Sequence, residues 1–322
     1  MSNEALRSFW YPVAATDELG PAPLATRLLD QPIVVYRAGE RLVAFADLCI
    51  HRGTPLSLGW IENDNLICAY HGWTYAPDGA CIRIPSLPAD RGIPRKARAT
   101  SYHVAQRYGL IWVCLDEPRA PIPDLPQLED PSYYTFFNGA QEWKTSAARM
   151  VENFIDISHF PFVHPGLLGD PTAPEIPGYK VERRDNELHF EGYAALPQEG
   201  VFHGDVEHYQ YRVVLPFTTQ FVRLLPGGER FVTTVITAPL AAKEMRRYQL
   251  LSRNYAFDRS DADFKQLSTA VVAQDQRIVE NQRPEELPLD LSAELHLKGP
   301  DAAAVEYRRM LAELGLTGPL VA

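Results

Sequence analysis

The chain has 322 residues, 46% of them hydrophobic, and a formal net charge of −10. Its length suggests two domains, and its charge argues against binding to nucleic acids or other phosphate-rich surfaces. No run of about eighteen apolar residues occurs, so we expect no membrane span. The first residues, MSNEALRSFW, lack the basic and apolar regions of a secretion signal.

The first part of the chain predicts an antiparallel β domain. Its apolar runs are residues 32–36, 42–45 and 110–114. Turn residues at 38–40 and 77–79 separate such runs, as in strands that are joined by tight turns. We therefore predict an all-β domain over residues 1–117.

Four potential metal ligands lie within this domain. Cys49 and His51 are two residues apart, and Cys68 and His71 are three residues apart. Zinc accepts two cysteines and two histidines, but zinc sites usually pair Cys with Cys and His with His. Here each pair contains one of each, which favours a 2Fe-2S cluster with two cysteines on one iron and two histidines on the other.

Histidine ligands change the redox properties of such a cluster. Replacing two thiolates by neutral imidazoles removes two negative charges, so the centre accepts an electron more easily. Clusters of this kind have potentials of about −150 to +300 mV, against roughly −400 mV for all-cysteine ferredoxins. A gap of about 250 mV is on the order of 6 kcal/mol per electron. We therefore expect this centre to accept electrons from a plant-type ferredoxin.

A proline-rich segment follows the β domain. Five prolines occur between residues 117 and 131, and proline favours an extended chain. We predict a linker over residues 118–131 and a second domain over residues 132–322.

The second domain begins with another set of potential metal ligands. Asn153, Asp156 and His159 recur every three residues, which predicts that they share one face of a helix. His164 lies five residues after His159 and cannot share that face while the helix continues. The prolines on either side of His164 predict a break in the helix, which would bring both histidines to one point.

Two converging histidines suggest a 2-His-1-carboxylate iron site, which needs one further oxygen ligand. Asp275 on a later predicted helix is a candidate, whereas Asp156 is a poor one if its side chain faces elsewhere. Such a triad leaves coordination positions open, as the activation of O₂ beside a substrate requires. Taken alone, the two histidines are equally compatible with capping or core positions.

The rest of the second domain predicts strands followed by a helix. Its β-like runs are residues 187–190, 209–214, 220–224, 231–236 and 247–251. Residues 261–282 have helical spacing. One stripe of this helix contains Phe264, Leu267, Val271 and Ile278. We therefore predict an α+β domain in which helices flank an antiparallel sheet, a helix-grip-like arrangement.

With both ligand sets in view, the chain resembles the terminal oxygenase component of Rieske non-heme iron oxygenases. The resemblance covers nearly the whole chain and includes both Cys–His pairs, Gly53 and the run 70–73 (YHGW). It implies that His159, His164 and Asp275 hold a mononuclear Fe(II). It also implies that Asp156 bridges a cluster histidine of one subunit to an iron histidine of its neighbour.

The branch of this family that the chain resembles contains vanillate O-demethylase oxygenases. This implies a homotrimer with head-to-tail contacts, fed by an NAD(P)H-dependent flavin and ferredoxin-type reductase. It also implies monooxygenation of a small, often carboxylated aromatic by O-demethylation or hydroxylation. Ring cis-dihydroxylation is the alternative within the same iron chemistry. A Rieske electron carrier is disfavoured, because about two hundred residues with a second ligand set follow the first domain.

Other residues carry less specific patterns. Trp73 either shields the cluster or packs as a core aromatic, and Asn153 either supports the bridge or is a polar residue of the helix face. Cys81 and Cys114 are expected to be reduced thiols, which points to the cytoplasm, although a disulfide between them stays open. Residues 253–255, near the end of a strand, either line the pocket or form a solvated strand end, and the solvated end is favoured. The remaining histidines are expected to be ordinary surface or core residues: His103, His189, His203, His208 and His296.

Overall fold

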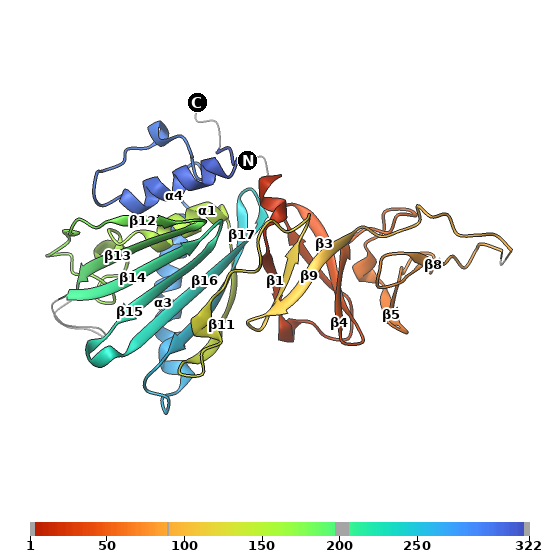
Figure 1. The fold of residues 1–322 in the computed structure, drawn as a ribbon, viewed down its shortest axis with the longest axis horizontal. Helices are drawn as coiled ribbons and strands as arrows, with labels where there is room; N and C mark the ends of the chain where they lie inside the picture. The colour runs from red at the N-terminus through yellow and green to blue at the C-terminus, as the bar shows by residue number, and fades with distance from the viewer. Residues whose placement is uncertain (1–3, 89, 197–205, 319–322) are drawn as a thin grey trace. The chain divides into compact units, whose positions relative to one another are not determined.

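A computed structural model describes residues 4–88, 90–196 and 206–318 and contains two compact units. The N-terminal unit contains Arg7–Ile122. The C-terminal unit contains the chain from Pro123 onward, together with the short stretch that precedes Arg7. Figure 1 follows the chain through both units. Among the described residues, no helix is long and apolar enough to cross a membrane.

The N-terminal unit consists of two antiparallel sheets. The larger sheet has the strand order β1-β10-β9-β4-β3-β2, and the smaller has the order β5-β6-β7-β8. The larger sheet contains β1 (Tyr11–Ala15), β2 (Leu24–Leu28), β3 (Gln31–Ala38), β4 (Arg41–Ala46), β9 (Ser101–Arg107) and β10 (Leu110–Cys114). The smaller contains β5 (Trp60–Glu62), β6 (Asn65–Ile67), β7 (Thr74–Tyr75) and β8 (Cys81–Arg83). Short 3₁₀ helices are η2 (Thr16–Glu18), η3 (Leu56–Leu58) and η1 (Ala5–Ser8), of which η1 spans the division before Arg7. The predicted β domain is confirmed.

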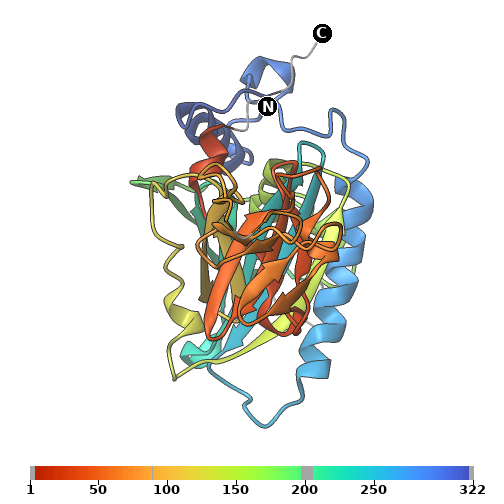
Figure 2. The same ribbon diagram turned by 90° about the vertical axis from the view of Figure 1, so that its right-hand side faces the viewer.

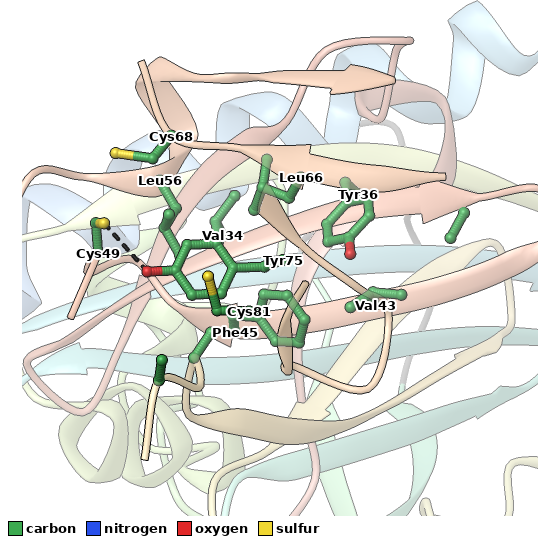
Figure 3. Close-up of a cluster of buried hydrophobic side chains, with 13 residues drawn as sticks. Val34, Tyr36, Val43, Phe45, Cys49, Leu56, Leu66, Cys68, Tyr75 and Cys81 are labelled. Atoms are coloured by element: carbon green, nitrogen blue, oxygen red, sulfur yellow. Dashed lines mark hydrogen bonds between the residues drawn. The ribbon is translucent and has the colours of Figure 1, made fainter. Parts of the chain in front are cut away.

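One hydrophobic cluster joins the two sheets. Alternate residues of β3 and β4 supply one side of this cluster, because successive side chains of a strand point to opposite faces. The small sheet and the loops beside it supply the other side, with Leu66 and Tyr75 fully buried. Each large apolar side chain buried in this way contributes about 1.5–3 kcal/mol. Figure 3 shows Cys49 and Cys68 at the same end of this cluster, so the core fixes the loops that carry them.

The C-terminal unit is built on one seven-stranded antiparallel sheet with the order β11-β17-β16-β15-β14-β13-β12. Its strands are β11 (Tyr134–Trp143), β12 (Val181–Arg184), β13 (Glu187–Ala195), β14 (Val206–Val214), β15 (Thr218–Leu224), β16 (Arg230–Ala241) and β17 (Glu244–Arg253). The five β-like runs of the sequence correspond to β13–β17. The sequence pattern did not predict β11 and β12.

The helices of this unit are α1 (Ala147–Ile155), α2 (Phe160–Val163), α3 (Asp261–Val279) and α4 (Ala302–Glu313), with 3₁₀ turns η4 (Pro126–Leu128), η5 (Pro226–Gly228) and η6 (Leu291–Ala293). Helix α1 contacts β15–β17, α3 contacts β11, and α2 contacts α3. Helix α4 contacts α1, the edge strand β12 and its neighbour β13. In Figure 1 α3 passes behind the sheet, and Figure 2 shows α3 along its full length. The predicted sheet flanked by helices is confirmed.

Helix α1 ends earlier than the sequence spacing predicted. Asp156 follows the last helical residue and has an extended backbone, with φ −86° and ψ 126°. Its carboxylate accepts a hydrogen bond from the Ser158 N–H at 2.7 Å, and such a local bond competes with helix continuation. Asn153, Asp156 and His159 therefore do not share a helix face, and that prediction is wrong.

Two further sequence predictions need correction. In α3, Ile278 is 43% exposed, and the side that faces the protein interior continues from Val271 to Asp275 instead. In the proline-rich segment, Leu125 is fully buried and a 3₁₀ turn, η4, follows it. The extended conformation predicted for this segment is therefore wrong for its second half, which packs on the C-terminal unit because Leu125 is apolar.

Candidate metal centres

The loops at Cys49 and Cys68 have the same backbone geometry. The Cys49 carbonyl accepts from the Gly53 N–H at 2.9 Å, and the Cys68 carbonyl accepts from the Gly72 N–H at 3.0 Å. Each cysteine N–H donates to the carbonyl five residues further on, at 2.8 and 2.9 Å. Both glycines have positive φ, +74° and +69°, which other residues rarely adopt. The two loops therefore form a matched pair.

The histidines of these loops lie together. The ring centroids of His51 and His71 are 4.5 Å apart. The Trp73 ring stacks on His51 at 4.5 Å with an interplanar angle of 9°. His51 Nδ1 is buried and has no hydrogen-bond partner among the described residues, an arrangement that is costly for a polar atom. A metal ion at Nδ1 would satisfy it, so the four side chains fit a 2Fe-2S cluster.

Tyr75 also contacts this site. No sequence pattern identified it, because an aromatic residue in a strand is typical of any core. Its hydroxyl lies 3.2 Å from Cys49 Sγ, a contact that is drawn as a dashed line in Figure 3. Burial raises the pKa of Tyr75, so the phenol keeps its proton and donates it toward the sulfur. All four cysteines are free thiols, and the alternative of a disulfide between Cys81 and Cys114 is wrong.

A second set of ligand atoms converges in the C-terminal unit. His159 and His164 lie at the two ends of α2, and Asp275 lies near the end of α3. The Nε2 atoms of the histidines lie 3.3 and 3.1 Å from Asp275 Oδ1. One ligand atom from each residue lies within 4.8 Å of the others. Two imidazoles and one carboxylate in this arrangement match a facial triad for iron.

The other nitrogen of each imidazole is held by an oxygen acceptor. His159 Nδ1 lies 3.2 Å from Asp156 Oδ2, and His164 Nδ1 lies 2.9 Å from Gln274 Oε1. Each Nδ1–H donates outward, so each Nε2 lone pair points at the triad. His164 Nε2 is buried, and the Asp275 carboxylate lies 3.1 Å from it. The donor set therefore fits a divalent metal.

The charges of the triad depend on these contacts. Burial would raise the pKa of Asp275, but hydrogen bonds from His159 and His164 hold it well below its usual range. Burial would lower the pKa of His159, but its bonds to Asp156 and Asp275 raise it to about 9. Without a metal ion, the triad therefore holds a proton that a cation can replace.

The segment between α1 and α2 places these ligands. An added Cβ at Gly192 of β13 would collide with the Ile157 side chain, so glycine lets this segment approach the sheet closely. The helix breaks at Asp156, not at the prolines, and that sequence prediction is wrong. Pro161 lies in the first turn of α2, where a missing N–H costs nothing. His164 still donates its N–H to the Phe160 carbonyl at 3.1 Å.

Asp156 and Asn153 have different contacts in the structure. Asp156 is bonded to His159 and its side chain is 35% exposed. Burial would raise its pKa, but the hydrogen bonds from His159 and Ser158 lower it. Asn153 Nδ2 donates to Asp275 Oδ1 at 3.4 Å. Asn153 therefore supports the carboxylate of the triad, whereas Asp156 contacts the triad only through an imidazole.

A cavity of about 240 Å³ adjoins the triad and lies between the sheet and α1–α3. Most of its wall is aromatic or aliphatic. The apolar lining residues are Trp143, Met150, Phe154, Phe160, Leu168, Tyr209, Phe221, Phe231, Leu251, Tyr255, Phe264, Leu267, Val271 and Val272. Such a cavity beside a metal triad is suited to a small, largely apolar ligand.

Comparisons with known proteins agree with both sites. Residues 9–103 match the family of the Rieske [2Fe-2S] domain, and residues 143–317 match the vanillate O-demethylase oxygenase C-terminal domain. The chain belongs to the Rieske non-heme iron oxygenases. These O₂-incorporating oxidoreductases carry a Rieske 2Fe-2S cluster, and the triad of this chain is consistent with their mononuclear iron site.

Several similar Rieske oxygenases are demethylases. Methylxanthine N1-demethylase NdmA of Pseudomonas putida is 32% identical over 97% of this chain and 90% of its own length. Methylxanthine N3-demethylase NdmB of the same organism is 31% identical over 97% and 90%. The structure of NdmA with caffeine has a TM-score of 0.87 at 31% identity and covers 97% of this chain and 91% of that one.

The expectation for residues 253–255 is wrong, and the histidines outside the metal sites are mostly paired with carboxylates. Arg253 is only 1% exposed and Tyr255 lines the cavity, so residues 253–255 are not a solvated strand end. The guanidinium of Arg253 lies over the Phe264 ring at 4.4 Å. The histidines beside nearby carboxylates are His103 with Glu117, His189 with Glu187 and His208 with Glu191. The ring of His296 is partly buried, and His203 lies outside the described residues.

Proposed function

We propose that this Rieske oxygenase monooxygenates a small aromatic substrate, by demethylation at oxygen or nitrogen or by hydroxylation. The observation that best supports this proposal is the apolar cavity of about 240 Å³ that opens onto the triad of His159, His164 and Asp275. Demethylation is favoured because NdmA and NdmB are named as demethylases. Ring cis-dihydroxylation remains the second candidate, since the same iron chemistry performs it.

Each metal has assigned ligands in this proposal. Mononuclear iron is bound by the triad, and the 2Fe-2S cluster by the Cys–His pairs of the two matched loops: Cys49, His51, Cys68 and His71. When bound, the cluster delivers electrons and the iron activates O₂. Demethylation of a methoxy group would consume O₂, two electrons and two protons, and would yield the hydroxyl compound, formaldehyde and water.

The residues around the iron ligands have supporting roles in this reaction. Asp156 and Gln274 hold the imidazoles in the orientation and tautomer that metal binding requires. Asn153 holds the Asp275 carboxylate. The aromatic lining excludes water from the substrate, and Trp73 covers one face of His51 in the cluster loops.

Asp156 also has the exposure that a bridge between subunits requires. One of its oxygens contacts His159, and about a third of the side chain, 35%, is exposed. A cluster histidine of a neighbouring subunit would bond to that exposed side. We therefore propose a homotrimer with head-to-tail contacts, because such contacts close into a ring. An NAD(P)H-dependent flavin and ferredoxin-type reductase would supply the electrons, in the cytoplasm, where the free cysteines stay reduced.

Metal analysis tests the two ligand sets. The purified protein should contain about three irons and two acid-labile sulfides per chain, as one cluster and one mononuclear site require. Zinc without sulfide would contradict the cluster. Sedimentation should show a trimer, and a fully active monomer would contradict the bridge between subunits.

Product analysis tests the reaction. Methoxylated and N-methylated aromatics should stimulate O₂ uptake with NADH and a reductase, and formaldehyde should form in equal amount to the demethylated product. Substrate-dependent cis-diol without formaldehyde would replace demethylation by the second candidate. Uptake of O₂ that yields only peroxide would support neither.

A further inference from the structure

Three arginines line the cavity, and they differ in their partners. Arg223 forms an ion pair with Glu207, and Arg259 pairs with Asp263 at 3.2 Å. Arg247 forms no ion pair with any carboxylate of the described chain, although it is the most deeply buried of the three at 3% exposure. Of the three arginines in the cavity wall, Arg247 is therefore the one whose positive charge is not paired with a carboxylate of the described chain.

The contacts of Arg247 do not account for its burial. Its guanidinium lies 5.4 Å from the Trp143 ring centroid, and Nε is buried without a hydrogen-bond partner among the described residues. Burial lowers the pKa of Arg247 to about 10, so it keeps its charge at neutral pH. A cation–π contact offsets only part of the desolvation of a buried cation.

The anion of the cavity wall whose charge acts on Arg247, Asp275, is already engaged. The Asp275 carboxylate contacts His159 and His164, and it would hold iron in the loaded enzyme. A divalent iron on one carboxylate leaves a positive charge, to which Arg247 adds another. An anionic ligand in the cavity would therefore offset the positive charge of Arg247.

A second hydrogen-bond donor lies beside Arg247. Gln249 follows two residues later on β17 and faces the same cavity. Its Oε1 accepts from Asn138 Nδ2 at 2.8 Å and from Ser268 Oγ at 3.0 Å. These bonds hold the amide, and its Nε2 donates to no acceptor in the described chain. Two donors without acceptors thus lie two residues apart on β17 and line the same cavity.

We propose that Arg247 anchors a carboxylate of the substrate, with Gln249 as the second donor. This inference rests on the proposed function and narrows its substrate to an aromatic acid that bears a methyl group on oxygen or nitrogen. The planar guanidinium binds a carboxylate through two parallel hydrogen bonds. The apolar lining then holds the ring, and the anchor sets how far the methyl group lies from the triad.

Equilibrium binding tests the anchor without turnover. Iron-loaded enzyme, kept anaerobic and without reductase, is titrated with the three isomers of methoxybenzoate and with their methyl esters, followed by calorimetry. At least one acid should bind about tenfold more tightly than its ester. Arg247→Met should weaken the binding of that acid by about 10- to 100-fold, as the loss of a charged hydrogen bond predicts. The same variant should change the affinity for the ester by less than about twofold.

Arg246→Met is the matched control, because Arg246 lies on the opposite face of β17 and outside the cavity wall. It should leave both affinities unchanged. Arg247→Lys, which keeps the charge but not the planar fork, should lie between wild type and Arg247→Met. Cluster absorbance and iron content establish that each variant is folded. Where Arg247→Met does not fold, the acid–ester comparison in the wild type decides.

Three results would overturn the anchor: failure of every acid to bind, equal affinities for acid and ester, or unchanged acid affinity in a folded Arg247→Met. Equal affinities for acid and ester in an enzyme that releases formaldehyde from neutral substrates would reject the anchor and leave the proposed function intact. Selective binding of acids by an enzyme that produces neither formaldehyde nor hydroxylated product would support the anchor and reject the proposed function.

Discussion

The two metal sites of this oxygenase are built in different ways. The cluster loops lie within one short stretch of the chain, and each contains its own backbone hydrogen bonds and a glycine with positive φ. The triad depends on contacts between distant segments, since His164 and Gln274 are 110 residues apart and Asn153 and Asp275 are 122 apart. A local site can therefore be read from spacing, whereas a distributed site depends on how helices pack.

The packing of the triad segment comes from neighbours that no local pattern identifies. Gly192 on β13 leaves space for Ile157, and α2 contacts α3, which carries Asp275. A change in the distributed site should therefore affect one metal and spare the other. The following variants use that difference.

The largest expected effect is that of Asp275→Ala. The triad loses its only carboxylate ligand, so iron should be absent from the mononuclear site and substrate turnover should fall below detection. The cluster should keep its visible absorbance, because no residue of its loops is changed. Iron and sulfide analysis would then give about two irons and two sulfides per chain. A variant that loses cluster and iron together would show that the two sites are not independent.

Asp156→Asn should preserve both metals and slow turnover. The amide keeps the size of the carboxylate but loses the charge that holds the His159 imidazole, and loss of such a partner costs about 10- to 100-fold. Iron content, cluster spectrum and turnover should be measured on the same preparation. Near-normal turnover in a fully metallated variant would reject the bridge, and loss of iron would instead make Asp156 a ligand.

The sequence predicted the cluster loops more completely than the triad, and the reasons are physical. Cysteine and histidine spacing sufficed for the cluster loops, since their geometry is local. For the triad, helical periodicity failed after Ile155, because the Asp156 side chain bonds to the backbone of Ser158 and ends the helix. Gln274 and Arg247 could not be predicted, because their roles follow from which strand or helix faces the cavity.

A buried ionic network holds α1, the helix before the iron ligands, and it should produce a moderate effect on stability. Glu294 Oε1 lies 2.6 Å from Arg149 of α1, and Glu294 Oε2 lies 2.5 Å from Arg308 of α4. Glu152 also pairs with Arg308, at 2.6 Å. Both arginines are 2% exposed. The network thus joins α1 to α4 and to the segment that contains Glu294.

Glu294→Gln should destabilise the C-terminal unit by about 1–2 kcal/mol near neutral pH, as loss of charged hydrogen bonds predicts. Burial would raise the pKa of Glu294, but Arg149 and Arg308 lower it from its ordinary value of 4.5. The stabilisation by the Glu294 carboxylate is therefore complete above its ordinary pKa and is lost as the pH falls through the lowered pKa of the folded protein. Urea unfolding followed by tryptophan fluorescence should show a difference from wild type that shrinks in acid.

Glu313→Gln is the control for that experiment. Glu313, the last residue of α4, pairs with Arg183 of β12 on the surface and is 64% exposed, so its loss should change stability little. An effect of Glu313→Gln equal to that of Glu294→Gln would contradict the special role of the buried network. Loss of the cluster absorbance at the same urea concentration as the fluorescence change would contradict independent sites.

The smallest expected effect concerns Tyr75, which is the exception to the local character of the cluster loops. Its hydroxyl reaches Cys49 Sγ from a strand of the small sheet at 3.2 Å. A hydrogen bond to a cluster sulfur stabilises the reduced, more negative form, so Tyr75→Phe should lower the reduction potential. A difference of about 1 kcal/mol between the redox states corresponds to about 40 mV.

Tyr36→Phe is the matched control, since Tyr36 is buried in the same hydrophobic cluster and its hydroxyl has no hydrogen-bond partner in the described chain. Redox titration of the visible absorbance should show a shift for Tyr75→Phe alone. Equal potentials in both variants would mean that the loops and their ligands set the potential without help from the sheet.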